Sequence, residues 1–398
     1  MKLAFFHDTI FKIDEDNNIY SHLLTMKVWK RYLAVFNDII ITARKKNLNS
    51  ANLSDLNGLI PVNGKHLTFN LLEKYTGSSG KILSQIKNLN QTNNQIKSAL
   101  IKSDASIMRL PSVVGLLACR QAIRLKKPWA VEVVACAYDG NINHKRLINR
   151  LFTPFLYFFT KHYVKKAPFA LYVTSKFLQN RYKNNNITTN VSNVEIELPD
   201  EEVLLKRLNK IDNLNKNTVL NFGVVGSLDV GFKGHYEAMT ALSKIKDKLP
   251  CFKLKFIGPG NPKYYYDLAK KLQLSDNFEF NGLLPNGKKV FEWMDNLDVF
   301  LIPSLQEGLP RALIEAMSRG CPSLGADTGG IIELIDYQFL HKKKDTNKLS
   351  LDILNLINNK DLMKTQAVDN FNKSKEFCNE ILNAKRTEFW MKYKNSIL

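Results

Sequence analysis

The sequence predicts an α/β protein built from two doubly wound domains. Its 398 residues exceed what one hydrophobic core usually serves. Short β-rich segments alternate with amphipathic segments along the whole chain, which is typical of right-handed βαβ units in parallel sheets. Charge also divides the chain, because residues 1–195 hold 28 Lys and Arg against 11 Asp and Glu, whereas residues 196–398 hold 29 against 26.

Each half contains five apolar segments of the kind that form buried parallel strands. They are residues 2–8, 38–44, 105–111, 129–135 and 169–175, then 218–227, 252–260, 278–284, 298–304 and 321–327. The acid-containing stretch 196–216 lacks a clear strand and is predicted to link the domains. We therefore expect domains at 1–195 and 217–375, followed by a C-terminal helix at 376–398.

Cysteine usage and apolar content indicate the cellular compartment in which we expect the protein. The five cysteines are scattered and form no CxxC pair, which favours reduced thiols over a disulfide framework or a zinc site. The first residues reach acids too soon for a signal peptide, and no run approaches the roughly 20 apolar residues that span a bilayer. We expect a cytoplasmic protein, soluble or bound at a surface.

The basic first half, with a net charge of +17, favours anionic partners such as nucleic acid, acidic lipid or a phosphorylated acceptor, although a solvated lysine-rich surface fits equally. Residues 145–166 combine six Lys or Arg with many aromatic residues and no acid. This composition suits contact with an anionic membrane surface, and it also suits a helix packed in the core. Pro154 is expected to interrupt any single helix there.

The segment from Pro303 to Glu333 carries the strongest functional pattern. Glu307 and Glu315 stand eight positions apart around the turn Gly308-Leu309-Pro310, which opens a helix predicted to run from Arg311 to Arg319. Both carboxylates can face one ligand together with the free amides of the first helical turn. The layout suits a sugar attached to a diphosphate, although each acid alone also fits a solvated or dipole-stabilising carboxylate.

Three loops earlier in the second half follow predicted strands. Lys233 lies between a strand end and a helix start, where open α/β sheets bind ligands and where a cation suits a diphosphate. Gly258 and the Gly282-Leu283 pair end two further strands and could offer backbone groups to a phosphate or a nucleobase. Taken singly, these motifs also fit an exposed lysine and ordinary turns.

Taken together, residues 219–336 resemble the donor-binding domain of retaining glycosyltransferases of family 4. The resemblance rests on motifs in the family's order and spacing: Glu307 with Glu315, Lys233-Gly234, Gly258-Pro259-Gly260, Pro303-Ser304 and Gly329-Gly330-Ile331-Ile332-Glu333. It implies the GT-B architecture, in which two Rossmann-like domains face each other across a cleft. The looser likeness of residues 109–112 and 171–182 points to the capsule and O-antigen group.

The resemblance implies a role for each matched residue. Glu307 would contact the donor sugar, Lys233 would neutralise the departing diphosphate and Glu315 would hold the ribose hydroxyls. The donor site would be completed by backbone groups of Gly308, Leu309 and the neighbours of Pro310, together with Ser227, Gly258, Gly282 and Leu283. No cofactor or metal is expected, and the C-terminal helix would pack on the first domain.

Departures from the family pattern leave parts of the site open. Many members carry an arginine where this chain has Ser227, so Arg109 from the first domain is a candidate for the second phosphate cation. The usual Gly-Gly loop after the first strand is replaced by residues 20–23, which hold no glycine. Asp139 and His144 are candidates for contacts with the acceptor. A purely structural role fits either residue equally well.

The sequence thus predicts a transferase that moves a sugar from a nucleoside diphosphate to a polysaccharide or a lipid-linked oligosaccharide, at the inner face of the plasma membrane. Two alternatives come from other classes. One is a nucleotide-sugar epimerase or a phosphorylase of the same fold. The other is a basic nucleic-acid-binding protein, for which the sequence shows no motif.

Overall fold

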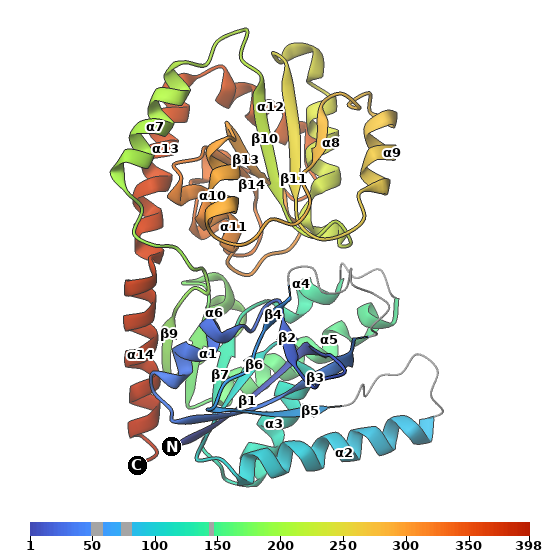
Figure 1. The fold of residues 1–398 in the computed structure, drawn as a ribbon, viewed down its shortest axis with the longest axis vertical. Coiled ribbons are helices and arrows are strands. Elements are labelled where there is room, and N and C mark those ends of the chain that lie inside the picture. The colour runs from blue at the N-terminus through green and yellow to red at the C-terminus, as the bar shows by residue number, and fades with distance from the viewer. Residues whose placement is uncertain (49–58, 73–81, 143–146) are drawn as a thin grey trace. The chain divides into compact units, whose positions relative to one another are not determined.

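The structure, a computed structural model, describes residues 1–48, 59–72, 82–142 and 147–398, which form two compact α/β units (Figure 1). The first unit comprises Met1–Ile142, the segment ending at Val191, and Asn383–Leu398. The second comprises Ser192–Leu382. The predicted linker contains a helix, α7 (Glu201–Asp212), whose N-terminus is capped by the Asp200 carboxylate.

The first unit is organised around a mostly parallel sheet of nine described strands. The central strand β1 pairs in parallel with β3 on one side and with β6 on the other, and the sheet continues through β7, β8 and β9. The short strand β2 pairs antiparallel with β1 and with β4. The strands are β1 (Lys2–Ile13), β2 (Ile19–Ser21), β3 (Asp38–Asn47), β4 (Ile60–Pro61), β5 (Leu67–Leu72), β6 (Ala105–Leu110), β7 (Ala130–Val133), β8 (Phe169–Tyr172) and β9 (Ile187–Asn190).

Helices pack on this sheet, and the last helix of the chain is among them. Tyr393 donates its hydroxyl to the Ser106 carbonyl at 3.1 Å, and Trp390 lies 6.3 Å from Tyr32 between ring centroids. Trp390 and Tyr393 are almost fully buried, so α14 supplies part of this unit's core. The helices are α1 (Met26–Leu33), α2 (Ile82–Ile101), α3 (Val113–Arg124), α4 (Ala137–Ile142), α5 (Leu147–Lys166), α6 (Phe177–Arg181) and α14 (Asn379–Asn395).

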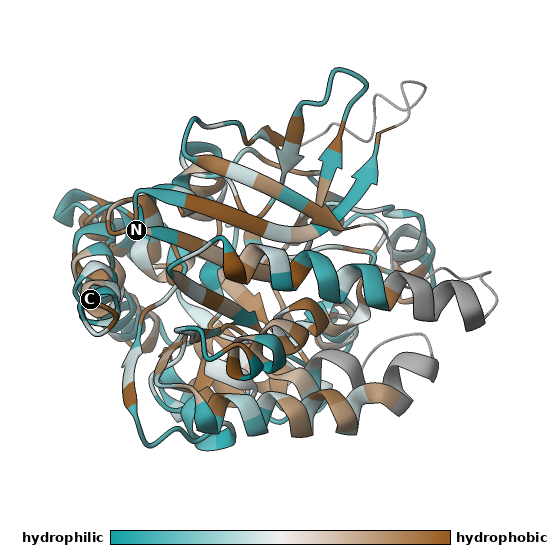
Figure 2. Ribbon diagram, turned by 90° about the horizontal axis from the view of Figure 1, so that it is seen from below, coloured by the Kyte–Doolittle hydropathy of each residue, from teal (hydrophilic) through white to brown (hydrophobic). Residues whose placement is uncertain are grey.

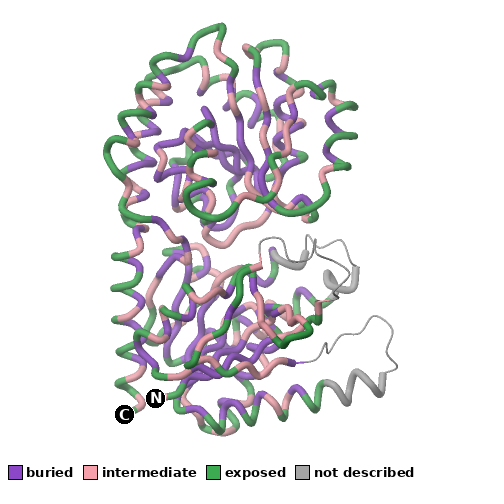
Figure 3. Tube along the Cα trace, in the orientation of Figure 1, coloured by how far each residue is buried: buried purple, intermediate pink, exposed green. Residues whose placement is uncertain are grey.

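The second unit contains a parallel sheet in the order β12-β11-β10-β13-β14-β15. Its inner strands are apolar and buried, as strands covered on both faces must be (Figure 3). The strands are β10 (Leu220–Val225), β11 (Phe252–Ile257), β12 (Phe278–Phe280), β13 (Val299–Ile302), β14 (Ser323–Ala326) and β15 (Leu340–His341).

Helices of the second unit bury one side, as α9 does with Tyr265, Leu268 and Ala269. Figure 2 shows apolar and polar residues alternating in the same way along helices of the first unit. Side chains of Asp345 and Asn359 accept hydrogen bonds from the first-turn amides of α12 and α13. The helices are α8 (His235–Ser243), α9 (Lys263–Lys271), α10 (Lys288–Asp295), α11 (Arg311–Ser318), α12 (Thr346–Ile357) and α13 (Lys360–Ser374), with 3-10 turns η2 (Gly231–Lys233), η3 (Lys246–Lys248), η4 (Gly329–Glu333), η5 (Tyr337–Phe339) and η6 (Lys375–Phe377).

The structure confirms the ten predicted strands and corrects the prediction for residues 145–166. Helix α5 passes through Pro154 without a break among its described residues. Proline removes one backbone hydrogen bond, but α5 packs against α4 and α3, and Tyr138 of α4 meets Tyr157 edge to face. Tertiary packing therefore outweighs the local cost of the proline.

Candidate functional site

The predicted residues of the second unit gather in loops at the carboxyl ends of neighbouring strands. Ser227 and Lys233 follow β10, Gly258 follows β11, and Glu307 follows β13. Because β11, β10 and β13 are adjacent and parallel, their carboxyl ends lie at one edge of the sheet. This edge is where open α/β sheets bind ligands.

Lys233 and Glu307 meet directly at this edge. The Lys233 Nζ donates to the Glu307 Oε1 at 2.8 Å, and the two side chains are 26% and 9% exposed. Two further bonds hold the loops together, because the Leu305 amide donates to the Phe232 carbonyl at 2.8 Å and the Ser304 hydroxyl donates to the Lys233 carbonyl at 3.4 Å. The sequence prediction placed both residues at one ligand, and the structure brings them into contact.

Two glycines allow the backbones of this edge to approach each other closely. Gly234 has φ +79°, and a Cβ there would lie 2.2 Å from the Pro303 carbonyl oxygen. Gly329 has φ +58°, and a Cβ there would lie 2.2 Å from the Glu307 carbonyl oxygen. Glycine is therefore required at both positions, and the loop that carries Glu307 packs directly on η4.

The loops after β10, β11 and β12 are joined by backbone hydrogen bonds. The Gly258 amide donates to the Gly282 carbonyl at 2.9 Å, and the Leu228 amide donates to the Pro259 carbonyl at 2.8 Å. The Ser227 hydroxyl accepts from the Asp229 amide at 3.3 Å. Leu283 is 46% exposed beside this ladder, so an apolar side chain faces solvent at the same edge.

The turn Gly308-Leu309-Pro310 leads into α11 as predicted, although the helix ends at Ser318. Glu307 precedes this helix, so its spacing from Glu315 includes a turn. The Gly330 amide donates to the Gly308 carbonyl at 2.6 Å and fixes the turn.

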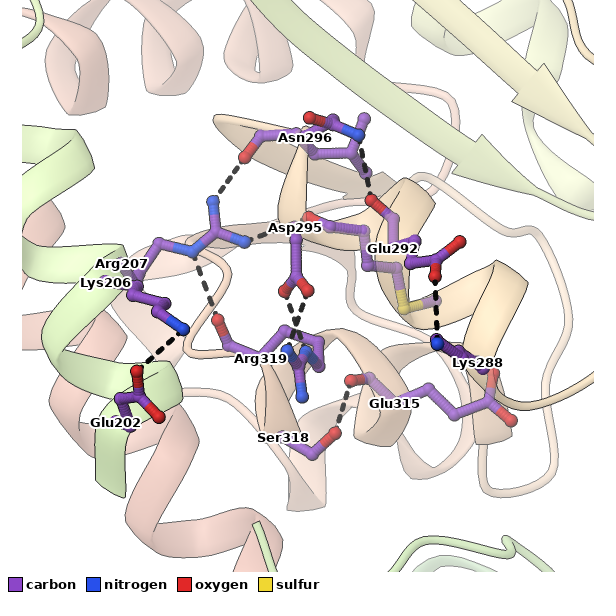
Figure 4. A network of polar contacts seen from close by, with 12 residues as sticks. Glu202, Lys206, Arg207, Lys288, Glu292, Asp295, Asn296, Glu315, Ser318 and Arg319 are labelled. Atoms are coloured by element: carbon purple, nitrogen blue, oxygen red, sulfur yellow. Dashed lines mark hydrogen bonds and ion pairs between the residues drawn. The ribbon is translucent and has the colours of Figure 1, made fainter. Parts of the chain in front are cut away.

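The far end of α11 is anchored by a network of arginine contacts (Figure 4). Arg319 forms two 2.7 Å bonds to the Asp295 carboxylate, and Arg207 donates to backbone carbonyls including that of Arg319. The helix that carries Glu315 is thus held at both ends.

Glu315 lies half-buried on α11, and burial raises the pKa of its carboxyl. The Arg311 cation opposes this rise in pKa, and the Glu195 carboxylate adds to it. No hydrogen bond of its carboxylate to Lys233 or Glu307 is seen among the described residues. The two acids of the motif therefore occupy separate environments in this edge of the sheet.

Arg109, expected at a phosphate, is engaged within the first unit. Its guanidinium lies 3.7 Å from the Glu132 carboxylate, with side-chain exposures of 14% and 2%. The two residues are partners in the register of β6 and β7. Burial, together with the Arg109 and Arg44 cations, lowers the pKa of His7 to about 3. Pairing with Glu132 leaves Arg109 less free for a phosphate than the sequence suggested.

The other candidate residues of the first unit are Asp139, His144 and the glycine-free segment 20–23. Asp139 is buried in the first turn of α4, and its carboxylate lies 3.3 Å from Arg181. His144 lies outside the described residues. Ser21 in the glycine-free segment accepts hydrogen bonds from the amides of Leu23 and Leu24.

Sequence reasoning missed Gly226, on which the Lys233 side chain rests. A Cβ at Gly226 would lie 2.7 Å from the Lys233 Cγ. The signal was present, because a glycine directly after a buried strand marks close approach.

Two absences concern only the part of the chain that the structure describes. Within it, no group of three or more His, Cys, Asp or Glu side chains is placed to hold a metal ion. Within it too, none of the helices has the length and apolar content to cross a membrane.

Comparison with known proteins identifies the family. The model of the glycosyl transferases group 1 family matches residues 220–359, the part of the chain that holds this edge. Protein CapJ of Staphylococcus aureus is 30% identical over 399 residues, covering 100% of this chain and 97% of CapJ. The putative colanic acid biosynthesis glycosyltransferase WcaL of Escherichia coli is 33% identical over 111 residues, covering 26% and 27% of the two chains.

The fold is shared with solved structures. Anabaena HepE, solved in complex with UDP-glucose, superimposes with a TM-score of 0.64 at 14% identity, covering 98% of this chain and 100% of HepE. The likeness confirms the predicted fold class of two α/β domains with parallel sheets, the GT-B class. Because the family model matches the residues that form the edge with Lys233 and Glu307, and a relative matches along the full length, the chain belongs to the group 1 glycosyltransferase family and is a glycosyltransferase.

Proposed function

We propose that this enzyme transfers a sugar from a nucleoside-diphosphate sugar to a polysaccharide or a lipid-linked oligosaccharide, with retention of configuration as in family 4. The observation that carries the proposal is the 2.8 Å pair of Lys233 and Glu307 at the carboxyl edge of the second sheet. A cation and a carboxylate side by side match a donor in which a diphosphate and a sugar hydroxyl are neighbours. The donor-binding domain is then the second unit.

Each part of the donor has a counterpart at this edge. Lys233 would bind the diphosphate, and Glu307 would accept hydrogen bonds from hydroxyls of the sugar. Glu315 would hold the ribose, and the loop with Gly282 and Leu283 would meet the base. Support comes from HepE, whose structure contains UDP-glucose.

Further contacts of the proposed donor site come from backbone groups. Gly308 and Leu309 offer amides near the start of α11, and the Pro310 ring shapes the turn although it has no N–H. Ser227 and Gly258 line the neighbouring loops, where a small hydroxyl and a residue without a side chain leave room for phosphate oxygens. All these groups come from the ends of adjacent strands.

In the proposed reaction, the bond between the anomeric carbon and the diphosphate oxygen breaks, and that oxygen takes the bonding electrons. The acceptor hydroxyl attacks the same face of the sugar, forms the new glycosidic bond and passes its proton to the departing phosphate. No covalent enzyme intermediate forms. Lys233 and the amides at the start of α11 stabilise the growing negative charge of the nucleoside diphosphate.

The acceptor side is assigned to the first unit. A glycan acceptor is supported by the name of WcaL, a putative glycosyltransferase of colanic acid biosynthesis. Capsule or lipopolysaccharide assembly on the cytoplasmic side of the membrane is the corresponding role. Asp139 and His144 remain the proposed acceptor contacts, and Arg109 remains the proposed second phosphate contact despite its ion pair with Glu132. The family match favours transfer over the epimerase, phosphorylase and nucleic-acid-binding alternatives.

The test is a screen of nucleoside-diphosphate sugars for thermal stabilisation of the protein. A donor at a hundred times its dissociation constant adds about 2.7 kcal/mol to the stability of the state that binds it. Lys233→Ala should weaken this stabilisation, and Glu307→Ala should abolish transfer while the fold stays intact.

A matched control is Lys271→Ala, which removes an exposed lysine at the C-terminal end of α9, away from this edge. Stabilisation by no nucleotide sugar would contradict the donor assignment. Undiminished affinity in Lys233→Ala would place the phosphate elsewhere, and full turnover in Glu307→Ala would refute the role of Glu307.

A further inference from the structure

Helix α5 presents a row of aromatic side chains to solvent. Phe152, Phe155 and Phe158 are 63%, 61% and 61% exposed and recur every three residues, so they lie on one face. Phe159 joins them, because its ring lies 4.4 Å from Phe155 and 5.5 Å from Phe158. Large apolar side chains gathered on a surface mark a site of contact with another molecule.

Cations continue this face toward the C-terminal end of α5. His162 stacks on Phe158 at 6.4 Å, and the exposed residues Lys161, Lys165 and Lys166 follow. The helix therefore carries an aromatic patch followed directly by a basic one.

The neighbouring helices extend the positive charge. Helix α3 packs against both α5 and α2, and the exposed Arg120 and Arg124 on α3 act electrostatically on Tyr163 of α5. Together α2, α3 and α5 hold eight Lys or Arg and no Asp or Glu. Three helices with eight cations and no acid favour an anionic partner.

We propose that this face, defined as Phe152, Phe155 and Phe158 with the cations of α5 and α3, docks the enzyme on an anionic lipid bilayer. Aromatic rings partition into the boundary between headgroups and acyl chains, and Lys and Arg bind the acidic headgroups above them. A double-stranded nucleic acid would engage the cations through its phosphates and leave the phenylalanine row in water. The bilayer uses both features. The docking deepens the proposed function and rests on it in one respect. A lipid-linked acceptor would lie at such a surface.

The test is co-sedimentation of the full-length protein with vesicles of phosphatidylcholine alone and of phosphatidylcholine mixed equally with phosphatidylglycerol. The wild type should bind the acidic vesicles, more weakly as salt rises. The triple variant Phe152→Ser, Phe155→Ser and Phe158→Ser should lose about a hundredfold in affinity. Because these side chains are exposed, the variant should keep the wild-type melting temperature.

The matched control for the aromatic row replaces Leu198, Leu205 and Leu351 by serine. These leucines are 63%, 60% and 62% exposed on the second unit, so three large apolar side chains of the same exposed fraction are removed elsewhere. The control should bind vesicles as the wild type does.

A second variant, with Arg124, Lys161 and Lys165 changed to glutamine, should lose about a hundredfold in affinity for acidic vesicles, at about fivefold per cation. Its control changes the exposed Lys216, Lys271 and Lys343 of the second unit and should lose little.

Four outcomes overturn the proposal: no binding of the wild type to acidic vesicles, equal binding to neutral ones, wild-type binding by the serine triple variant, or equal losses in a variant and its control. Donor-induced thermal stabilisation, measured without vesicles, should be the same in wild type and docking variants. A failure of docking with intact donor stabilisation would reject this face alone, whereas absent donor stabilisation would reject the proposed function.

Discussion

The substitution Gly329→Ala tests whether the packing of η4 on the loop of Glu307 sets activity. A Cβ at position 329 would lie 2.2 Å from the Glu307 carbonyl oxygen, whereas real Cβ atoms essentially never come within 3.0 Å of such an atom. The loop must therefore move by about 0.8 Å. A misplacement near 1 Å of a group that orients substrate costs about a hundredfold in rate. We expect kcat/KM for transfer to fall by about this factor.

Gly320→Ala provides the matched control. Gly320 has φ +57°, close to the +58° of Gly329, so both variants pay the same cost of about 1–2 kcal/mol for alanine in the left-handed region. At position 320 the nearest atom is the Leu204 Cδ1 at 3.3 Å, which is the end of a flexible side chain. Gly320→Ala should lower the melting temperature and leave turnover unchanged. Equal turnover in the two variants would refute the reasoning.

Three further predictions follow from buried charges and from the donor chemistry. Glu132→Gln leaves Arg109 and Arg386 buried without their carboxylate, so the first unit should lose about 3–5 kcal/mol in urea titration. The control Glu279→Gln removes a carboxylate from an exposed ion pair and should change the free energy of unfolding by less than about 0.5 kcal/mol. Equal losses in the two variants would contradict the stabilising role of Glu132 beside Arg109 and Arg386. The raised pKa of Glu315 means that its contribution to stability is complete below the unfolded-state pKa and is lost as pH rises through the folded-state pKa. Glu315→Gln should therefore stabilise the second unit at pH 7 while weakening donor binding, and unchanged melting there would argue against burial of this carboxyl. Transfer should proceed in excess EDTA, and a loss reversed by Mg²⁺ or Mn²⁺ would reject the metal-free prediction.

The parallel strands and the edge with Lys233 and Glu307 were predictable because both follow from short-range patterns. Buried parallel strands are continuous apolar runs, and βαβ connectivity then fixes which of their ends coincide. Lys233 and Glu307 are 74 positions apart, yet each lies in the connection that follows a strand. Knowing the strands was sufficient to expect the two side chains at one edge.

Contacts that depend on register or on packing could not be predicted in the same way. To predict the ion pair of Arg109 with Glu132, one must know that these residues are partners between β6 and β7. Short strands such as β2, β4 and β15 carry too few residues for a pattern. The exposure of Phe155 also escaped prediction, because an aromatic row at helical spacing looks the same in a core and on a surface.

The return of α14 to the first unit has a consequence for synthesis of the protein. Trp390 and Tyr393 are buried beside Tyr32 and Phe169, yet the ribosome makes the whole segment Ser192–Leu382 between them. At about 5–20 residues per second, the emerging first unit waits on the order of ten seconds or more with this aromatic surface uncovered. The second unit is contiguous and can fold during that interval, so the nascent chain completes its later half before its earlier one.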